Sequence, residues 1–424
     1  MRRVCVIDVV GLTPRQMQHA RRLSALAPHK PWRSPVPAVT ATCQATMMTG
    51  LPPSAHGVVA NGWLYRETGE VRFWQQSRQL IQAPVLDEEV ATAKLFWWFV
   101  QGTRVPWFVT PKPHYGADGS KVFDIIDASG CALEEHIGKF PFHAFWGPAS
   151  GLAATDWIAR AAARVMRQQK PELTLVYLPH LDYDHQRRGP GAANPVAEVD
   201  RAAGEVIDAA HEIGATVIAV SEYGIVPVRR AVPINHVLRE NGLLEVRDGP
   251  FGEMLDTHGS RAFAVADHQL AHVYVRDGET ARVRQLLATT PGIAEVVEPG
   301  DLELNHPRSG ELVALAETDA WFSYYYWLDP NRAPDFAPTV DIHRKPGFDP
   351  CELFMTSRPR AGLRLLQKML GFRYRMDVIP LDPSLVGGSH GLRPAPEDGP
   401  LIIGHGAPDR MTDFADYVRG LLHA

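Results

Sequence analysis

The stretch Val4-Cys5-Val6-Ile7-Asp8-Val9-Val10-Gly11 lies close to the start of the 424-residue chain, and it decides the class of fold. An apolar run of this length that ends at a glycine is typical of a strand buried on both faces of a sheet. Its one acidic residue, Asp8, comes late in the strand. Because this run begins almost at once, it reads as a strand and not as a cleavable signal peptide, and we expect a cytoplasmic protein.

The segments that follow alternate between helical and extended patterns. Thr13-Pro14 predicts a helix that continues to about Leu26, and a second helix is predicted to begin near Thr40 and to end before Gly50. Further helices are predicted over residues 155–169, 196–213 and 410–423, and further buried strands over residues 94–100, 173–178 and 216–220. This alternation predicts an α/β fold with a mostly parallel central sheet flanked by helices.

The pattern changes after about residue 234. Residues 272–275, 279–288 and 293–297 predict a strand, a helix and a strand, which indicates a small inserted α+β subdomain. We therefore expect three sections: the first part of the core over residues 1–235, the inserted subdomain over 236–320, and the completion of the core over 321–424.

Composition excludes several classes of partner. The chain has 43 Lys plus Arg against 48 Asp plus Glu, a net charge of -5, so it lacks the basic footprint of a nucleic-acid-binding protein. No apolar run approaches the roughly 18 residues that span a bilayer. The four cysteines have no paired spacing, which argues against a disulfide framework and a zinc–thiolate site. We expect neither nucleic acid nor membrane as a partner.

Three predicted strands each deliver an acid at their carboxyl ends. Asp8 lies late in the first strand, Asp182 follows the strand over residues 173–178, and Glu222 follows the strand over residues 216–220. The carboxyl ends of parallel strands are where ligands bind in open α/β sheets. Three carboxylates at one edge repel one another, and a divalent cation removes that conflict. His390, in the glycine-rich segment Gly387-Gly388-Ser389-His390-Gly391, is a further candidate ligand.

Thr40 lies at the predicted start of a helix, in Thr40-Ala41-Thr42-Cys43-Gln44-Ala45-Thr46. The free backbone N–H groups and the dipole of a helix N-terminus favour an anion there. Thr40 alone would be an ordinary N-cap, but beside a metal its hydroxyl can act as a nucleophile. Cys43 is a second candidate nucleophile, and it ranks below Thr40 because its neighbours supply no base.

Two blocks of sequence carry a family resemblance. Residues 37–51 (PAVTATCQATMMTGL) and 54–61 (SAHGVVAN), taken with Asp8, Asp182, Ser221-Glu222-Tyr223-Gly224 and Ser389-His390-Gly391 in this order, resemble the type I phosphodiesterase/nucleotide pyrophosphatase family of the alkaline phosphatase superfamily. The resemblance covers most of the chain. It implies an alkaline-phosphatase-like core, with the C-terminal section carrying a metal-binding loop.

The resemblance also implies roles for single residues. Thr40 matches the metal-bound nucleophile that forms a phospho-enzyme, and Asn61 matches the asparagine that binds a non-bridging phosphate oxygen. One metal would be held by Asp8, Thr40 and Glu222, and a second by Asp182 and His390. The family typically uses zinc, and a metal pair clamps the attacking and leaving oxygens.

Several positions depart from the family pattern. Glu222-Tyr223 stands where the family has Asp-His, Gln186 stands where it has a histidine, and Cys43 stands where it usually has an asparagine. Because tyrosine and glutamine are poorer zinc ligands than imidazole, we expect at least one weak metal site, and manganese or magnesium at the oxygen-rich Glu222 side. The further candidate ligands are Gln186, Tyr223, His185 and His343.

The function expected from the sequence is a metal-dependent phosphoryl hydrolase of the phosphodiesterase or pyrophosphatase type, acting on a small phosphorylated metabolite through a threonine nucleophile. One alternative is a phosphomonoesterase or phosphomutase of the same superfamily. Another is a degenerate member that binds a phosphorylated metabolite without turnover. We expect one or two divalent metal ions per chain, zinc or else manganese or magnesium. The sequence leaves the substrate and the oligomeric state open.

Overall fold

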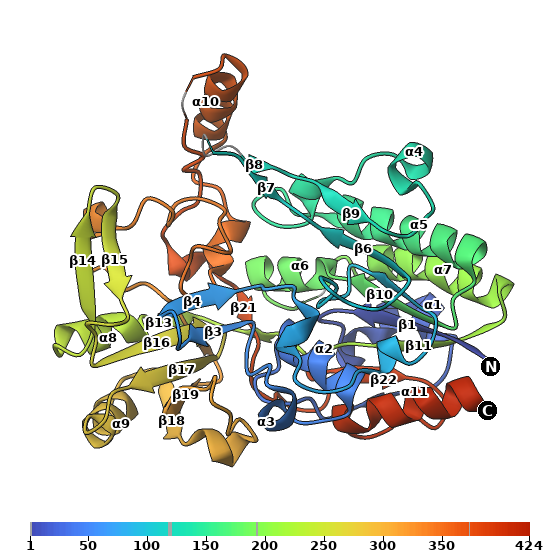
Figure 1. Ribbon diagram of the computed structural model, residues 1–424, viewed down its shortest axis with the longest axis horizontal. Coiled ribbons are helices and arrows are strands. Elements are labelled where there is room, and N and C mark those ends of the chain that lie inside the picture. Colours follow the sequence, from blue (N-terminus) through green and yellow to red (C-terminus); the bar gives the residue numbers. More distant parts are fainter. Residues whose placement is uncertain (1, 118–120, 192–193, 373) are drawn as a thin grey trace.

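The computed structural model describes residues 2–117, 121–191, 194–372 and 374–424, and it is built around one large sheet (Figure 1). The strand order is β2-β22-β11-β1-β10-β5-β6-β9. These strands are β1 (Arg3–Val9), β2 (His29–Pro31), β5 (Thr92–Leu95), β6 (Trp107–Pro111), β9 (Ile125–Asp127), β10 (Leu173–Leu178), β11 (Ala215–Val220) and β22 (Leu401–Ile403). The five central strands run parallel and the others pair antiparallel, so the predicted mostly parallel sheet is confirmed.

Helices cover both faces of this sheet. On one face, α5 (Leu152–Gln169) and α7 (Val196–Glu212) pack against each other and against β10, β11 and β1. On the other face lie α2 (Thr40–Thr49) and α11 (Phe414–His423), which contact each other (Figure 1). Their apolar side chains meet those of the sheet in one continuous hydrophobic core. The result is the three-layer α/β arrangement that the alternating sequence pattern predicts.

A second sheet lies beside the first and has a hydrophobic core of its own. Its order is β16-β17-β19-β18, formed by β16 (Ala262–Asp267), β17 (Leu270–Val275), β18 (Ile293–Val297) and β19 (Leu312–Ala316), with α8 (Ile234–Glu240) and α9 (Thr280–Ala288) beside it. The predicted strand, helix and strand over residues 272–297 are found as β17, α9 and β18. The section boundaries at residues 235 and 320 stay a prediction.

The remaining elements are short, apart from α10. The helices are α1 (Arg21–Ser24), α3 (Pro53–His56), α4 (Leu133–Ile137), α6 (His180–Arg188) and α10 (Arg358–Met369). The strands form two-stranded pairs: β3 (Gly62–Tyr65) with β4 (Glu70–Phe73), β7 (His114–Tyr115) with β8 (Lys121–Val122), β12 (Val226–Pro227) with β21 (Gly388–Ser389), β13 (Arg230–Val232) with β20 (Ala320–Phe322), and β14 (Glu245–Gly249) with β15 (Gly252–Asp256). None of the helices in the described residues is both long and apolar enough to cross a membrane.

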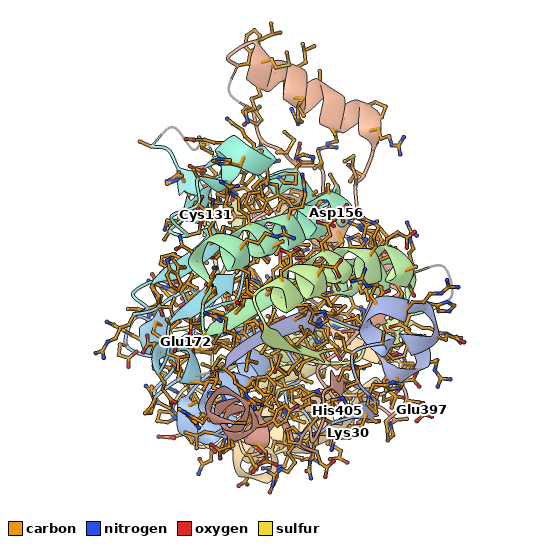
Figure 2. The ribbon with its side chains drawn as sticks, turned by 90° about the vertical axis from the view of Figure 1, so that its right-hand side faces the viewer. Lys30, Cys131, Asp156, Glu172, Glu397 and His405 are labelled. Atoms are coloured by element: carbon orange, nitrogen blue, oxygen red, sulfur yellow. The ribbon has the colours of Figure 1, made fainter. Side chains whose placement is uncertain are left out.

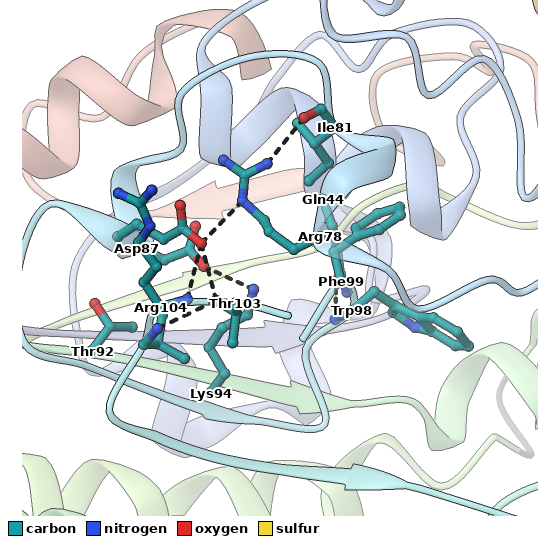
Figure 3. A network of polar contacts seen from close by, with 12 residues as sticks. Gln44, Arg78, Ile81, Asp87, Thr92, Lys94, Trp98, Phe99, Thr103 and Arg104 are labelled. Atoms are coloured by element: carbon teal, nitrogen blue, oxygen red, sulfur yellow. Dashed lines mark hydrogen bonds and ion pairs between the residues drawn. The ribbon is translucent and has the colours of Figure 1, made fainter. Parts of the chain in front are cut away.

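Two predicted elements are wrong in extent. The helix expected from Thr13 to Leu26 is a 3-10 turn over Pro14–His19 followed by α1, and the strand expected over residues 94–100 ends at Leu95. Phe96 and Phe99 have positive φ angles, which end the strand. Side chains satisfy the backbone beyond it, because the N–H of Trp98 donates to Oε1 of Gln44 at 2.8 Å (Figure 3). The apolar run over residues 94–100 therefore indicates that these residues are buried, but it does not indicate that their backbone is extended.

A buried ion pair lies next to this turn (Figure 3). The Lys94 ammonium on β5 donates to Asp87 at 2.8 Å, and the two side chains are 2% and 1% exposed. Removing either partner would leave the other as an unpaired buried charge, which costs about 3–5 kcal/mol. This pair is a structural ion pair of the core and lies apart from the acids at the carboxyl end of the sheet.

Candidate active site

The three acids singled out in the sequence meet at one edge of the central sheet. β1 lies between β10 and β11, and Asp8 is in register with Tyr177 on one side and Val220 on the other. Asp182 lies in the first turn of α6, directly after β10, and Glu222 lies two residues beyond β11. All three are buried. The parallel topology therefore brings together residues that are far apart in the sequence.

Thr40 is the first residue of α2, preceded by Val39 in extended conformation. The helix begins there as predicted and ends at Gly50, whose φ of 70 is the left-handed conformation that glycine adopts most easily. The Thr40 hydroxyl lies 3.0 Å from the hydroxyl of Tyr223 and close enough to Glu222 to lower the pKa of that carboxyl. The hydroxyl therefore lies at a helix N-terminus and beside an acid.

Asp8 and Glu222 form a pair of carboxyl groups that lack partners. Their four carboxyl oxygens are buried without a hydrogen-bond partner among the described residues. Burial raises the pKa of Asp8 from 3.8 to about 7, and burial together with the charge of Asp8 raises the pKa of Glu222 well above its ordinary value. Four unpartnered oxygens from two adjacent carboxyl groups have the chemistry of a site for a hard divalent cation.

Gln44 completes this group, and the sequence reasoning did not include it. It lies one turn after Thr40 on α2, and its side chain lowers the pKa of both Asp8 and Glu222. The i, i+4 spacing from Thr40 was the signal available in the sequence, because such residues share one face of a helix. Thr40 and Gln44 therefore turn the buried face of α2 towards the two acids.

The second predicted metal position is built differently. The Gln186 amide donates to both carboxyl oxygens of Asp182 at 2.9 Å, and the Tyr223 side chain also lowers the pKa of Asp182. The Tyr223 ring stacks on the His390 ring with centroids 3.6 Å apart. His390 donates from Nδ1 to the carbonyl of Ala38 at 2.7 Å, and its Nε2 lies 3.6 Å from Asp182. The four side chains thus contact one another directly.

A cation fits the first position and not the second. The carboxyl oxygens of Asp8 and Glu222 have no hydrogen-bond partner among the described residues, and Thr40, Gln44 and Tyr223 are the polar side chains beside them. At the second position Asp182 is already engaged by Gln186, and the buried imidazoles there are His390 and His268, whose rings lie 3.6 Å apart. Within the part of the chain that the structure describes, no group of three or more His, Cys, Asp or Glu side chains is arranged to hold a metal. The unpartnered carboxyl oxygens of Asp8 and Glu222 therefore give the first position the donor chemistry for a cation.

The remaining candidates, His185, His343 and Cys43, are each directed at another group. His185 is on α6, but its Nε2 lies 2.9 Å from the Gln16 amide. His343 lies with Nδ1 3.3 Å from the carbonyl of Phe73. Cys43 is buried with its sulfur directed at the backbone carbonyl of Glu222, and burial raises the pKa of its thiol well above the ordinary value. A thiol held in its protonated form is a poor nucleophile, so Thr40 stays the better candidate.

Asn61 lies at the mouth of the site and is held in place by Asp267, which the sequence reasoning missed. Asn61 donates to Asp267 through its backbone N–H at 2.7 Å and its side-chain amide at 3.1 Å, and its Oδ1 accepts from the backbone N–H of Ala41. Asp267 ends β16 of the second sheet and is buried. One amide hydrogen of Asn61 remains for a ligand next to Thr40.

A small aromatic hollow, with room for about one water molecule, adjoins Asn61 and Ala41. Its other lining residues are Trp63, Tyr65, Arg72, Trp74, Gln75, Trp98 and Phe99. Most of them come from the β3–β4 hairpin and from the turn after β5. The hollow presents flat apolar faces and one guanidinium, so a planar group carried by a ligand at Thr40 could stack there only after these side chains move apart.

The fold and the site together define an α/β protein with a threonine hydroxyl beside buried carboxyl groups at the carboxyl edge of a parallel sheet. Residues 4–349 match the family model for type I phosphodiesterase / nucleotide pyrophosphatase. The chain belongs to this family, and it is a phosphoester hydrolase of the alkaline phosphatase superfamily. Among curated proteins, none matches the sequence significantly.

Solved structures share the fold at low identity. Phosphonoacetate hydrolase from Sinorhizobium meliloti 1021, in complex with phosphonoformate, superposes with a TM-score of 0.60 and 14% identity, over 99% of this chain and 96% of the other. Murine ectonucleotide pyrophosphatase / phosphodiesterase 5 gives a TM-score of 0.58 and 13% identity, over 100% and 95%. The human form of that protein gives 0.57 and 13%, with the same shares covered. The alkaline-phosphatase-like fold is therefore confirmed.

Proposed function

We propose that the protein hydrolyses a phosphodiester or pyrophosphate bond of a small metabolite with Thr40 as nucleophile and one divalent cation at the Asp8–Glu222 pair. One observation carries this proposal. The Thr40 hydroxyl, at the N-terminus of α2, lies beside two buried carboxyl groups whose oxygens have no partner among the described residues. A buried pair of this kind is costly unless a cation or a proton joins it.

Each residue has a defined part in this proposal. The Thr40 oxygen forms a bond to phosphorus as one ester or anhydride oxygen leaves and takes up the proton that the hydroxyl loses. Water then releases the rest of the substrate from the threonine as a phosphomonoester. The Tyr223 hydroxyl, 3.0 Å away, fixes the direction of the Thr40 hydroxyl. Asn61, held by Asp267, offers an N–H to a non-bridging oxygen. A divalent cation, when bound, supplies positive charge beside the nucleophile and the phosphoryl group.

The aromatic hollow supports a substrate that carries a flat organic group. If Asn61 binds the phosphoryl group of the substrate, the flat organic group would extend towards Trp63 and Trp74. Among the solved neighbours, an inactive variant of murine ectonucleotide pyrophosphatase / phosphodiesterase 5 is in complex with AMP. A flat group on the substrate favours an organic phosphate over an inorganic one, and both diesters and monoesters can carry such a group. Hydrolysis of phosphate monoesters is the alternative that the assay below separates.

The donors around the cation support manganese or magnesium. Asp8, Glu222 and Thr40 supply oxygen only, and among the described residues the nearest imidazole of the site, that of His390, faces Asp182 instead. Oxygen-rich shells suit these harder ions, whereas imidazole favours zinc. The four cysteines are free and buried. Free thiols are common in the reducing cytoplasm, which supports the cytoplasmic location expected from the sequence.

Hydrolysis of bis-nitrophenyl phosphate tests this function. The purified protein, stripped of metal with a chelator, should gain activity on addition of Mn²⁺ or Mg²⁺ and should prefer the diester over nitrophenyl phosphate. Thr40→Ala should remove the activity while the protein stays folded. A preference for the monoester would favour the phosphomonoesterase alternative. The absence of turnover with Mn²⁺, Mg²⁺ or Zn²⁺, together with tight phosphate binding, would identify a binding protein instead.

A further inference from the structure

Helix α10 projects away from the body of the molecule (Figures 1 and 2). It has 12 residues, and none of them is buried. Of the fifteen large apolar side chains that are exposed in the described part of the chain, seven lie between residues 355 and 372. They are Met355, Leu363, Leu365, Leu366, Met369, Leu370 and Phe372, and Met369 is 79% exposed. Among the described residues, no other segment concentrates apolar surface in this way.

The helix turns its polar side inwards and its apolar side outwards. Arg360 and Arg364, one turn apart, both donate to Asp377 on the segment that returns from the helix, Arg364 at 2.7 Å. Gln367 accepts from Arg364 and is only half-buried, on the same side of the helix. Leu363, Leu366 and Leu370 lie on the opposite side. A helix that covers a hydrophobic core turns its apolar side towards that core. The exposed apolar side of α10 is therefore suited to contact another molecule.

The charge around this apolar side indicates the kind of partner. Residues 354–377 contain six Lys or Arg and one acid, Asp377, which pairs with Arg360, Arg364 and Arg375, in a chain whose net charge is -5. Among the described residues, no ion pair links Arg358 or Lys368 to an acid. A strongly amphipathic helix with apolar residues on one side and basic residues beside them binds at the surface of anionic membranes. A second copy of the chain fits less well, because two such helices would bring their basic residues together.

Size also argues against a dimer. A helix of 12 residues is about 18 Å long, and one face of it buries far less than the roughly 1,000 Å² that a stable protein interface needs. We propose that α10 docks on an anionic phospholipid surface, with Leu363, Leu366 and Met369 in the boundary between headgroups and acyl chains. This revises the expectation of no membrane partner, which rested on segments long enough to span the bilayer. Surface docking needs only one short amphipathic helix.

Vesicle flotation with the full-length protein tests this proposal. Vesicles of phosphatidylcholine alone are compared with vesicles of equal parts phosphatidylcholine and phosphatidylserine. The protein should float with the mixed vesicles and not with phosphatidylcholine alone. The double variant Leu366→Asn/Met369→Asn should lose at least tenfold in binding. The matched control Met254→Asn/Leu328→Asn, which changes two exposed apolar residues elsewhere, should bind like the parent chain.

A second pair of variants tests the charge. Arg358→Gln/Lys368→Gln should weaken binding by about 30-fold, since each basic residue near an anionic surface contributes about fivefold. The control Arg2→Gln/Arg276→Gln removes the same charge elsewhere and should have little effect. Circular dichroism and thermal unfolding verify that all variants fold.

Three results would overturn the proposal. The first is that the parent chain fails to float with the mixed vesicles. The second is that the helix variants bind these vesicles as well as the parent chain does. The third is that the parent chain does not bind lipid and that light scattering shows a dimer, which Leu366→Asn/Met369→Asn abolishes. That result would assign this side of α10 to a second copy of the chain.

Discussion

Replacing Asp8 with asparagine should stabilise the metal-free protein, although it removes a residue from the centre of the fold. Burial raises the pKa of Asp8 from 3.8 to about 7. At about 1.4 kcal/mol per tenfold change in acidity, ionising this carboxyl group in the folded protein costs about 4 kcal/mol. Asparagine has the same shape and carries no charge, so Asp8→Asn avoids that cost. The stabilised form should then have lost its site for a cation.

The size of the effect can be expressed as a change in Tm. For a chain of 424 residues, the entropy of unfolding is about 0.9 kcal/mol per degree, so 4 kcal/mol corresponds to a rise of about 4 °C. Differential scanning calorimetry at pH 7.5 in the presence of a chelator measures this directly. Added Mn²⁺ should raise the Tm of the parent chain and leave that of Asp8→Asn unchanged.

Asp87→Asn is the matched control, because Asp87 is equally buried but is paired with Lys94. This substitution leaves an unpaired buried ammonium and should lower stability by about 3–5 kcal/mol. The protection by Mn²⁺ should persist in this variant. The reasoning is refuted if Asp8→Asn lowers the Tm in chelator, or if Mn²⁺ protects Asp8→Asn as well as it protects the parent chain.

The remaining predictions concern turnover, positioning and pH. Thr40→Ala should reduce kcat by about a thousandfold or more while phosphate still binds, and near-normal turnover in steady-state assays would exclude Thr40 as nucleophile. Asp267→Ala should lower activity through loss of the hydrogen bonds that hold Asn61, and a crystal structure with Asn61 unmoved would contradict this. Stability of the metal-free protein should fall as pH rises from about 4 to about 7, because the folded state retains protons on Asp8 and Asp182 that the unfolded chain has released. Thermal unfolding across that range in chelator checks it, and rising stability would be inconsistent with it.

The elements of the core that position the site could be predicted from the sequence because they follow simple periodicities. The strands that carry Asp8, Asp182 and Glu222 are short apolar runs, and the helix that begins at Thr40 ends at a glycine. Parallel pairing of adjacent strands then brings the three acids to one edge. The turn at Phe96 could not be predicted in this way, since a buried turn is as apolar as a buried strand. Its backbone is satisfied by side chains from other segments.

The polar contacts of the site were beyond sequence reasoning for a different reason. The ligand set of the second metal position depended on whether Gln186 and Tyr223 leave Asp182 free, and only their side-chain geometry shows that they contact it. Asp267 comes from the second sheet, more than two hundred residues away from Asn61 in the sequence. A contact between two sheets leaves no local pattern. The resemblance identified the positions, but not what the substituted side chains do there.

The number of cations bound per chain tests the central claim most directly. The protein is loaded with Mn²⁺ or Zn²⁺, dialysed, and analysed by plasma mass spectrometry, together with the double variant Gln186→His/Tyr223→His, which restores the imidazoles of the family pattern. The account predicts one cation per chain, lost in Asp8→Asn, and a second zinc ion only in the double variant. Two tightly held zinc ions in the parent chain would contradict it.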